Sequence, residues 1–292
     1  MRPLRSGVCE LVWPPRHRRH LLRPFMNYRA VLSLALGLWV VAGPLAASAH
    51  GAEATNRFGF AEFLLVPLRV HLLSATVATN LSTTLTEQDI ARILPKMNRV
   101  WAQAGVHFFI ESLMREEAAG QDGYAERART NEPPALLTLR PEASRSSNQF
   151  HIYYLHRCQP NGIYIGPGGI FVKDTASLRK VEGGIDEPLP RVSSHELGHA
   201  FTLQHRQDVT NLMASGTTGT WLNDAEIKQA REAAKKKEWI QPAPDVLKRA
   251  DDLDKAGKSD AARRLFGIVA AVPIDVEETQ RARRWVKERE KP

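Results

Sequence analysis

One twelve-residue stretch constrains this chain more than any other feature. Residues 194–205 read S-H-E-L-G-H-A-F-T-L-Q-H. On a helix, His195 and His199 are four residues apart, so their side chains leave the same face about one turn apart. Two imidazoles in this arrangement can bind one zinc ion, and Glu196 beside them can reach a water molecule at the metal. With His205 as a third ligand, the fourth position stays open, which is typical of a catalytic rather than a structural zinc site.

The wider pattern resembles a known family. The histidine stretch, followed by N-L-M-A-S at residues 211–215, is similar to the metzincin clan of zinc metallopeptidases, in a bacterial matrixin-like or reprolysin-like form. The family pattern is H-E-x-x-H-x-x-G-x-x-H and then a Met-turn. The resemblance implies the following roles: zinc ligands His195, His199 and His205, a general base Glu196, and a Met-turn residue Met213 under the site.

The chain departs from the family pattern at one position. Thr202 stands where the family usually has a glycine that ends the helix and lets the third histidine turn back to the metal. Glycine adopts positive φ at little cost, whereas a β-branched residue does so rarely. If the helix continued, His205 would lie about 240° around from His199 and miss the zinc. Either Thr202 makes the turn, or the third ligand is elsewhere, with Asp208 the nearest substitute and Glu226 a distant one.

The first 49 residues have the pattern of a secretory leader. An apolar run at 30–45 is shorter than the ~20 residues of a spanning helix, and A-S-A precedes a predicted cleavage point after Ala49. A start at Met26 would give a signal peptide of ordinary length. A rival interpretation takes the arginine pair in residues 18–22 as a twin-arginine export signal. Either signal predicts a secreted or periplasmic protein with no stable membrane span after cleavage.

The leader also explains the charge of the chain. Residues 1–49 hold seven Arg and one Glu, a net +6 of the full chain's +8, which leaves about +2 for the remainder. The basic balance therefore does not indicate nucleic-acid binding. Cys9 lies in the leader and Cys158 is the other cysteine of the chain, so an intramolecular disulfide is not expected after cleavage. The mature part is long enough for one good-sized core and a small appendage.

Residues 65–240 are predicted to form the catalytic domain, after a short N-terminal segment at 50–64. A strand at 66–73 precedes a helix that opens at Thr86 with a capping box and ends at Gly105. A second strand at 106–111 follows, and strand, long helix, strand suits a crossover onto a parallel sheet. We expect an α/β (α+β) fold that is metzincin-like, with a twisted mixed sheet, a long backing helix and an active-site helix.

The middle of the domain carries the remaining strands. Residues 115–149 are polar and are expected to form a surface insertion with a short helix near 135–137. Strands are expected at 150–155, 162–165 and 169–172, and in metzincins an edge strand above the active helix pairs with the substrate backbone. One of the short pieces is a candidate for that role, although a plain core strand explains it equally well. A loop at 174–190 follows, and Pro190 is well placed to open the active-site helix.

The C-terminal part reads as helical. Asn223 caps a helix that runs to about Trp239, with Glu226 reaching back to the cap. A Q-P-A-P linker follows at 241–244. Residues 245–288 are expected to form a small helical hairpin that packs on the catalytic domain and offers a possible partner contact.

These observations favour a secreted zinc-dependent endopeptidase that acts on peptide or protein substrates through a zinc-activated water. Two alternatives stay open. The first is a non-catalytic, zinc-stabilised binding module, against which the intact Glu196 argues, because a structural site has no use for that carboxylate. The second is a zinc amidohydrolase that acts on a non-peptide amide, since its metal chemistry would be the same.

Overall fold

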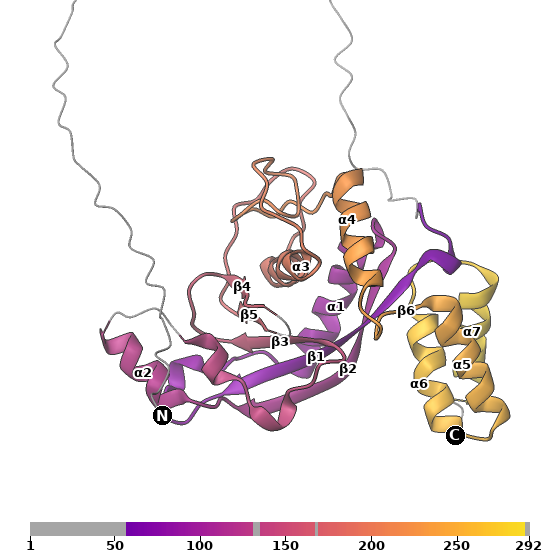
Figure 1. Ribbon diagram of the computed structural model, residues 1–292, viewed down its shortest axis with the longest axis horizontal. Helices are drawn as coiled ribbons and strands as arrows, with labels where there is room; N and C mark the ends of the chain where they lie inside the picture. The colour runs from indigo at the N-terminus through magenta and orange to yellow at the C-terminus, as the bar shows by residue number, and fades with distance from the viewer. Residues whose placement is uncertain (1–56, 131–134, 167–168, 290–292) are drawn as a thin grey trace, which may run out of the picture. The chain divides into compact units, whose positions relative to one another are not determined.

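The computed structural model describes residues 57–130, 135–166 and 169–289 (Figure 1). The expected leader at 1–49, its cleavage point and residues 50–56 lie outside this part of the chain. Within it, the fold is mixed α/β, with a central mixed sheet and seven α-helices.

The sheet has the parallel core that the crossover pattern predicts. Its strands are β1 (Leu64–Ser74), β2 (Val106–Glu117), β3 (Phe150–Leu155), β4 (Gly162–Tyr164), β5 (Ile170–Lys173) and β6 (Gln241–Pro242). The order is β2-β1-β3-β5-β4, and β6 pairs with β1. Pairs among β2, β1, β3 and β5 are parallel, whereas β4 runs antiparallel to β5 and β6 antiparallel to β1. The short strand β4 therefore ends the sheet.

Two helices cover one face of the sheet (Figure 1). The first, α1 (Glu87–Ala102), begins at the predicted capping box, in which Thr86 and Asp89 bond to each other's backbone N–H. Pro95 lies inside this helix. The second, α3 (Pro188–Ala200), carries the histidine motif and begins two residues before the proline expected to open it. Proline at a first turn leaves no backbone donor without a partner.

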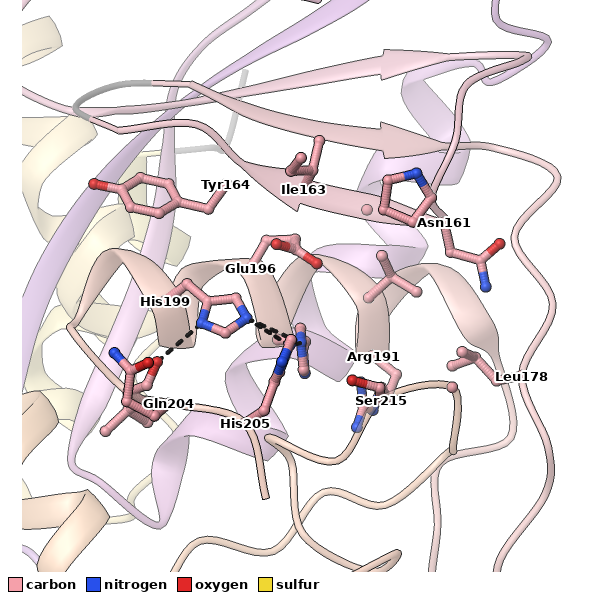
Figure 2. Close-up of a pocket in the computed structure, with 16 residues that line it drawn as sticks. Asn161, Ile163, Tyr164, Leu178, Arg191, Glu196, His199, Gln204, His205 and Ser215 are labelled. Atoms are coloured by element: carbon pink, nitrogen blue, oxygen red, sulfur yellow. Dashed lines mark hydrogen bonds between the residues drawn. The ribbon is translucent and has the colours of Figure 1, made fainter. Parts of the chain in front are cut away.

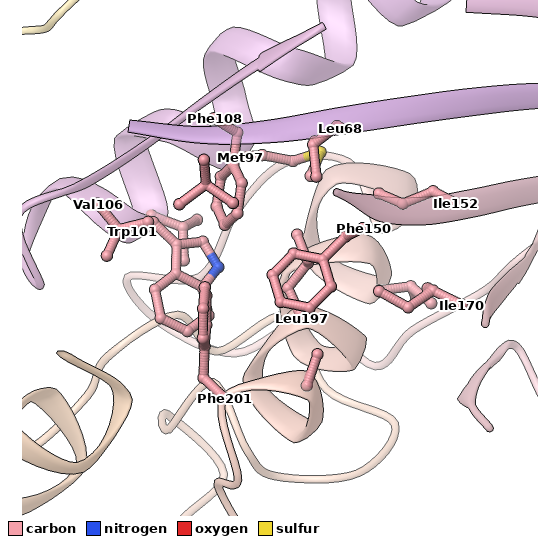
Figure 3. Packing of buried hydrophobic residues seen from close by; sticks show 14 of the residues in the cluster. Leu68, Met97, Trp101, Val106, Phe108, Phe150, Ile152, Ile170, Leu197 and Phe201 are labelled. Atoms are coloured by element: carbon pink, nitrogen blue, oxygen red, sulfur yellow. The ribbon is translucent and has the colours of Figure 1, made fainter. Parts of the chain in front are cut away.

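An aromatic group joins these helices to the sheet (Figure 3). Trp101 of α1 meets Phe108 of β2 and Phe201, the residue after α3, edge to face, and Phe150 of β3 meets Phe201 in the same way. All four side chains are buried. Burying a large apolar side chain contributes roughly 1.5–3 kcal/mol, so this group fixes the end of α3 against the sheet.

The insertion after β2 contains more regular structure than the sequence pattern predicted. It holds the unpredicted helix α2 (Gln121–Thr130) and two 3-10 turns, η3 (Leu136–Leu139) and η4 (Glu142–Ser144). The expected short helix near 135–137 is confirmed as η3. A further 3-10 turn, η2 (Thr79–Leu81), follows β1, and apolar residues of these segments form a cluster on the other face of the sheet.

The C-terminal expectation is partly wrong. Helix α4 (Asp224–Lys235) has the predicted Asn223 cap but stops before Trp239. The segment expected as a hairpin contains three helices, α5 (Ala243–Lys255), α6 (Ser259–Ala270) and α7 (Glu277–Arg289). They share an apolar cluster with the 3-10 turn η1 (Phe60–Glu62) and the start of β1. In the described part of the chain, no helix combines the length and apolarity needed to cross a bilayer.

Candidate metal centre

The end of α3 shows how the chain accommodates Thr202. This residue has φ of +68°, in the left-handed region that glycine usually occupies. The amide of Thr202 donates to His199 O at 2.9 Å, and the amide of Leu203 donates to Gly198 O at 2.9 Å. These two bonds form the Schellman motif, which satisfies the last carbonyls of a helix. The chain therefore turns back at the position where the family has glycine.

The turn brings three histidines together (Figure 2). The Nε2 atoms of His195 and His199 are 3.2 Å apart, those of His195 and His205 are 3.2 Å apart, and those of His199 and His205 are 3.1 Å apart. In the part of the chain that the structure describes, this is the one group of three or more His, Cys, Asp or Glu residues whose ligand atoms converge. The three side chains could hold a metal ion.

The far nitrogens of two of these rings are held by backbone carbonyls. His195 Nδ1 lies 2.8 Å from Leu212 O, and His199 Nδ1 lies 2.9 Å from Leu203 O. A carbonyl can only accept, so each Nδ1 carries the proton and each Nε2 keeps a lone pair. Fixing the tautomer in this way is how proteins prepare a histidine to bind a metal. The donor set therefore fits a metal that prefers imidazole nitrogen, such as zinc.

Burial keeps the imidazoles of His195 and His199 neutral. Burial, with smaller contributions from Arg191 and the other two rings, lowers the pKa of His195 to about 3. Burial also lowers the pKa of His199. Neutral imidazole is the form that binds a metal, so His195 and His199 do not have to lose protons at neutral pH before they bind an ion.

Glu196 lies beside the three rings, between α3 and β4 (Figure 2). Burial raises the pKa of its carboxyl to about 7, against the opposing effects of the Tyr164 backbone N–H and the charge of Arg191. Its fit against β4 is close, because a Cβ on Gly162 would come within 2.9 Å of Glu196 Oε1 and 2.4 Å of Val192 Cγ1. The absence of a side chain at Gly162 therefore leaves the space that the Glu196 carboxylate occupies.

Met213 lies under the helix, as the resemblance implied. It is fully buried, and a Cβ on Gly198 would lie 2.5 Å from its sulfur. The turn that carries Met213 is held by Asn211, whose Oδ1 accepts from the Met213 amide at 2.6 Å. The same turn supplies the Leu212 carbonyl that orients His195. The turn thus lies beneath α3 and also orients the ring of His195.

The two substitutes for the third ligand have other partners. Glu226 is buried, and its carboxylate accepts from Arg206 Nε at 2.5 Å, Asn211 Nδ2 at 2.8 Å and the Asn223 amide at 2.9 Å. Asp208 accepts from the amide and hydroxyl of Thr210. Neither carboxylate belongs to the converging group, so the geometry favours His205 as the third ligand.

A cavity of about 720 Å³ opens on the three histidines and Glu196. The strand β4 forms one wall through Gly162, Ile163 and Tyr164. Two contributors to this cavity, Gly162 and Arg191, were not predicted as site residues. The position of Arg191, one turn before His195 on the same helix, was the one available signal, because residues four apart share a helix face.

Two comparisons of this sequence with known proteins found no relative. A scan against protein-family models gives no match, and a search of the curated proteins gives no significant match.

Proposed function

We propose that this chain is a secreted or periplasmic zinc-dependent endopeptidase of metzincin-like type. The observation that carries the proposal is the convergence of three imidazole Nε2 atoms, within 3.2 Å of one another, in the cavity that also holds the Glu196 carboxylate. A structural zinc site closes its coordination with a fourth protein ligand, whereas three histidines and a neighbouring acid are the pattern of a hydrolytic site.

His195, His199 and His205 would hold the ion. Zinc in this position supplies a Lewis acid that polarises a peptide carbonyl and makes a water acidic enough to lose its proton near neutral pH. The chain's own contribution is proton transfer by Glu196. Its carboxylate takes the proton of the attacking water and then returns it to the nitrogen of the departing amine. A buried carboxyl with a raised pKa suits both steps, because it can accept and release a proton near neutral pH.

The edge strand β4 supports an extended peptide as substrate. It ends the sheet, pairs on one side with β5 and lines the cavity with Gly162, Ile163 and Tyr164. A peptide added to its free side would run past the histidines, held by main-chain hydrogen bonds that do not depend on side-chain identity. This geometry favours an endopeptidase over a hydrolase of small non-peptide amides.

The test uses the mature chain from His50 with one zinc per chain. Glu196→Ala should keep the zinc, because Glu196 is not a ligand, and should lose at least about a hundredfold in peptide cleavage, the size of a general-base contribution. Glu182→Ala is a matched control, because Glu182 is exposed and does not line the cavity. Robust cleavage by Glu196→Ala would overturn the mechanism. Tightly bound zinc without cleavage of any peptide by the wild type would favour the binding module, and cleavage of non-peptide amides alone would favour the amidohydrolase.

A further inference from the structure

The cavity contains a buried cation to which the proposed chemistry gives no contact with the substrate. Arg191 lies on α3 one turn before His195 and is 2% exposed, yet it lines the cavity. Figure 2 shows it with Leu178 and Ser215 on one side of the histidines. It is a charged group in the wall of the cavity that also holds the three histidines.

This guanidinium is held by backbone carbonyls and forms no ion pair, although the charge of Glu196 in the same cavity acts on it and raises its pKa. Nε donates to Gly219 O at 3.1 Å, and Nη2 donates to Asn211 O at 3.4 Å and Ala214 O at 2.5 Å. These carbonyls stabilise the charge without cancelling it. Among the described residues, no carboxylate forms an ion pair with Arg191, and none accepts from its Nη1. Burial lowers its pKa to about 10 against the opposing effect of the Glu196 charge, and this value is far above neutral pH, so the guanidinium stays charged.

The neighbouring rim adds positive charge. Segment 179–181 is bonded through its backbone to the wall of the cavity, with Arg179 N donating to Gly216 O at 2.9 Å and Thr218 N donating to Arg179 O at 3.0 Å. Arg179 and Lys180 are exposed, and within the described part of the chain neither forms an ion pair. The acid nearest in sequence, Glu182, is exposed too. The balance on this side of the cavity is therefore basic.

We propose that this side of the cavity binds an acidic substrate side chain, Asp or Glu, next to the cleaved bond, and that Arg191 selects it. The inference rests on the proposed peptidase function. A buried guanidinium that forms no direct ion pair is costly for the free protein, and a carboxylate is its best partner because charge-assisted bonds are about twice as strong as neutral ones. The apolar walls of Leu178 and Val192 exclude water from the pair and strengthen it.

The test is a peptide series on the wild-type zinc protein. Each of the two positions flanking the cleaved bond is varied separately through Asp, Asn, Glu, Gln and Leu, with every peptide amidated at its C-terminus. At one position, kcat/KM for the acid should exceed that for its matched amide by about tenfold or more, the size of a hydrogen bond to a charged group. Equal rates for acids and amides at both positions would overturn the inference while leaving the peptidase intact. Failure to cleave any peptide would overturn the proposed function itself.

Two variants assign the preference to Arg191. Arg191→Met should bring the ratio of kcat/KM for the acid to that for its amide close to one. Arg191→Lys should keep part of the preference, because lysine retains the charge but cannot form the two parallel hydrogen bonds of a guanidinium. Lys235→Met is the matched control, since it removes one exposed charge in the last turn of α4. If Arg191→Met fails to fold, the wild-type peptide series still decides whether the cavity prefers an acidic side chain over its matched amide. A second series with free C-termini separates the side-chain site from a site for a terminal carboxylate, and a preference seen only in that series would also overturn the inference.

Discussion

Arg206, the residue after the third histidine, donates from Nε to the buried carboxylate of Glu226 at 2.5 Å. Its backbone is held as well, since the Arg206 amide donates to Met213 O at 3.0 Å. Glu226 also binds Asn211 at the base of the Met213 turn. One carboxylate thus connects α4 to both segments that carry His205 and Met213, and this explains why Glu226 lies close to the site without belonging to the converging group.

Loss of this carboxylate should weaken metal binding indirectly. Glu226→Ala should raise the zinc Kd by about tenfold or more, the size seen when a residue that orients a ligand is removed, with a fall in stability of about 1–3 kcal/mol from the buried groups left without partners. Competition with a chelator and urea unfolding measure the two effects. Asp224→Ala is the control on the same helix, because Asp224 pairs with Arg57 in an exposed bridge. An unchanged zinc Kd in Glu226→Ala would contradict this role.

Thr202 stores strain that glycine would relieve. A β-branched residue at φ +68° costs about 1–2 kcal/mol relative to glycine. Thr202→Gly should therefore raise the unfolding free energy by up to about that amount and leave zinc binding unchanged, measured by urea unfolding and zinc competition. The lost hydroxyl contact with Gln229 Nε2, at 3.2 Å, is minor because Gln229 also donates to Thr202 O at 2.7 Å.

Thr202→Ala separates the two effects, since it removes the hydroxyl and keeps the Cβ that causes the strain. It should gain little or nothing in stability. Thr202→Pro should lose the site, because proline holds φ near −65°. A Thr202→Gly variant less stable than Thr202→Ala would show that the threonine backbone is not strained.

Local patterns predicted much of this molecule. The capping boxes at Thr86 and Asn223 are made by residues three apart, so their hydrogen bonds could be read from the sequence alone, and both are present. The spacing of His195 and His199 predicted their shared face for the same reason. The position of His205 depended on whether Thr202 could take a left-handed backbone. Sequence could pose that alternative, but the Schellman bonds and the Gln229 contact decide it.

Features that depend on distant contacts were missed. Gly162 was expected at the start of a strand, but its contact with Glu196 arises only where β4 lies against α3. Arg191 is buried because the loop at 211–219 supplies the carbonyls that it bonds. Helix α7 was not predicted as a separate element because its buried residues are few, with Thr279 and Ala282 as its fully buried positions.

Gly162 provides a test of how closely Glu196 must be placed. In Gly162→Ala the new Cβ would contact both Val192 and Glu196 at less than 3.0 Å, so the carboxylate or the strand has to move. A displacement of about 1 Å at a reacting group can cost about a hundredfold in rate. We expect kcat to fall by about that factor with zinc affinity retained, because the three histidines are not touched. Steady-state cleavage and zinc competition measure the two quantities.

The control for this variant is Gly267→Ala. Gly267 lies in α6, and a Cβ there would meet nothing within 4 Å, so activity should be unchanged and helix stability slightly raised. Wild-type kcat in Gly162→Ala would mean that Glu196 does not need the bare backbone of β4. Loss of zinc together with activity would mean that the substitution disturbs α3 as a whole.

A buried histidine pair on the other face of the sheet predicts how stability depends on pH. His71 Nδ1 lies 2.5 Å from Glu116 Oε1, and His71 Nε2 lies 2.9 Å from His151 Nδ1. The other nitrogen of His151, Nε2, lies 3.3 Å from the Ser146 amide nitrogen and 3.1 Å from the Ser146 carbonyl oxygen. Burial, with the charge of the neighbouring ring, lowers the pKa of His71 to about 3, and burial lowers the pKa of His151 to about 4.

The unfolded chain, with histidine pKa values near 6.5, therefore takes up these protons first as the pH falls. The fold should have its full stability from this pair above pH 6.5 and lose up to about 1.4 kcal/mol per pH unit for each histidine as the pH falls from 6.5 towards the native values. Burial also raises the pKa of Glu116, which opposes the loss of stability where that carboxyl titrates.

Urea unfolding between pH 7.5 and 5, with a chelator present so that zinc does not contribute, measures how the unfolding free energy changes with pH. His71→Asn can still donate to Glu116 and should reduce that slope by the amount that corresponds to about one proton. An identical slope in the wild type and the variant would show that His71 is not held neutral by the fold.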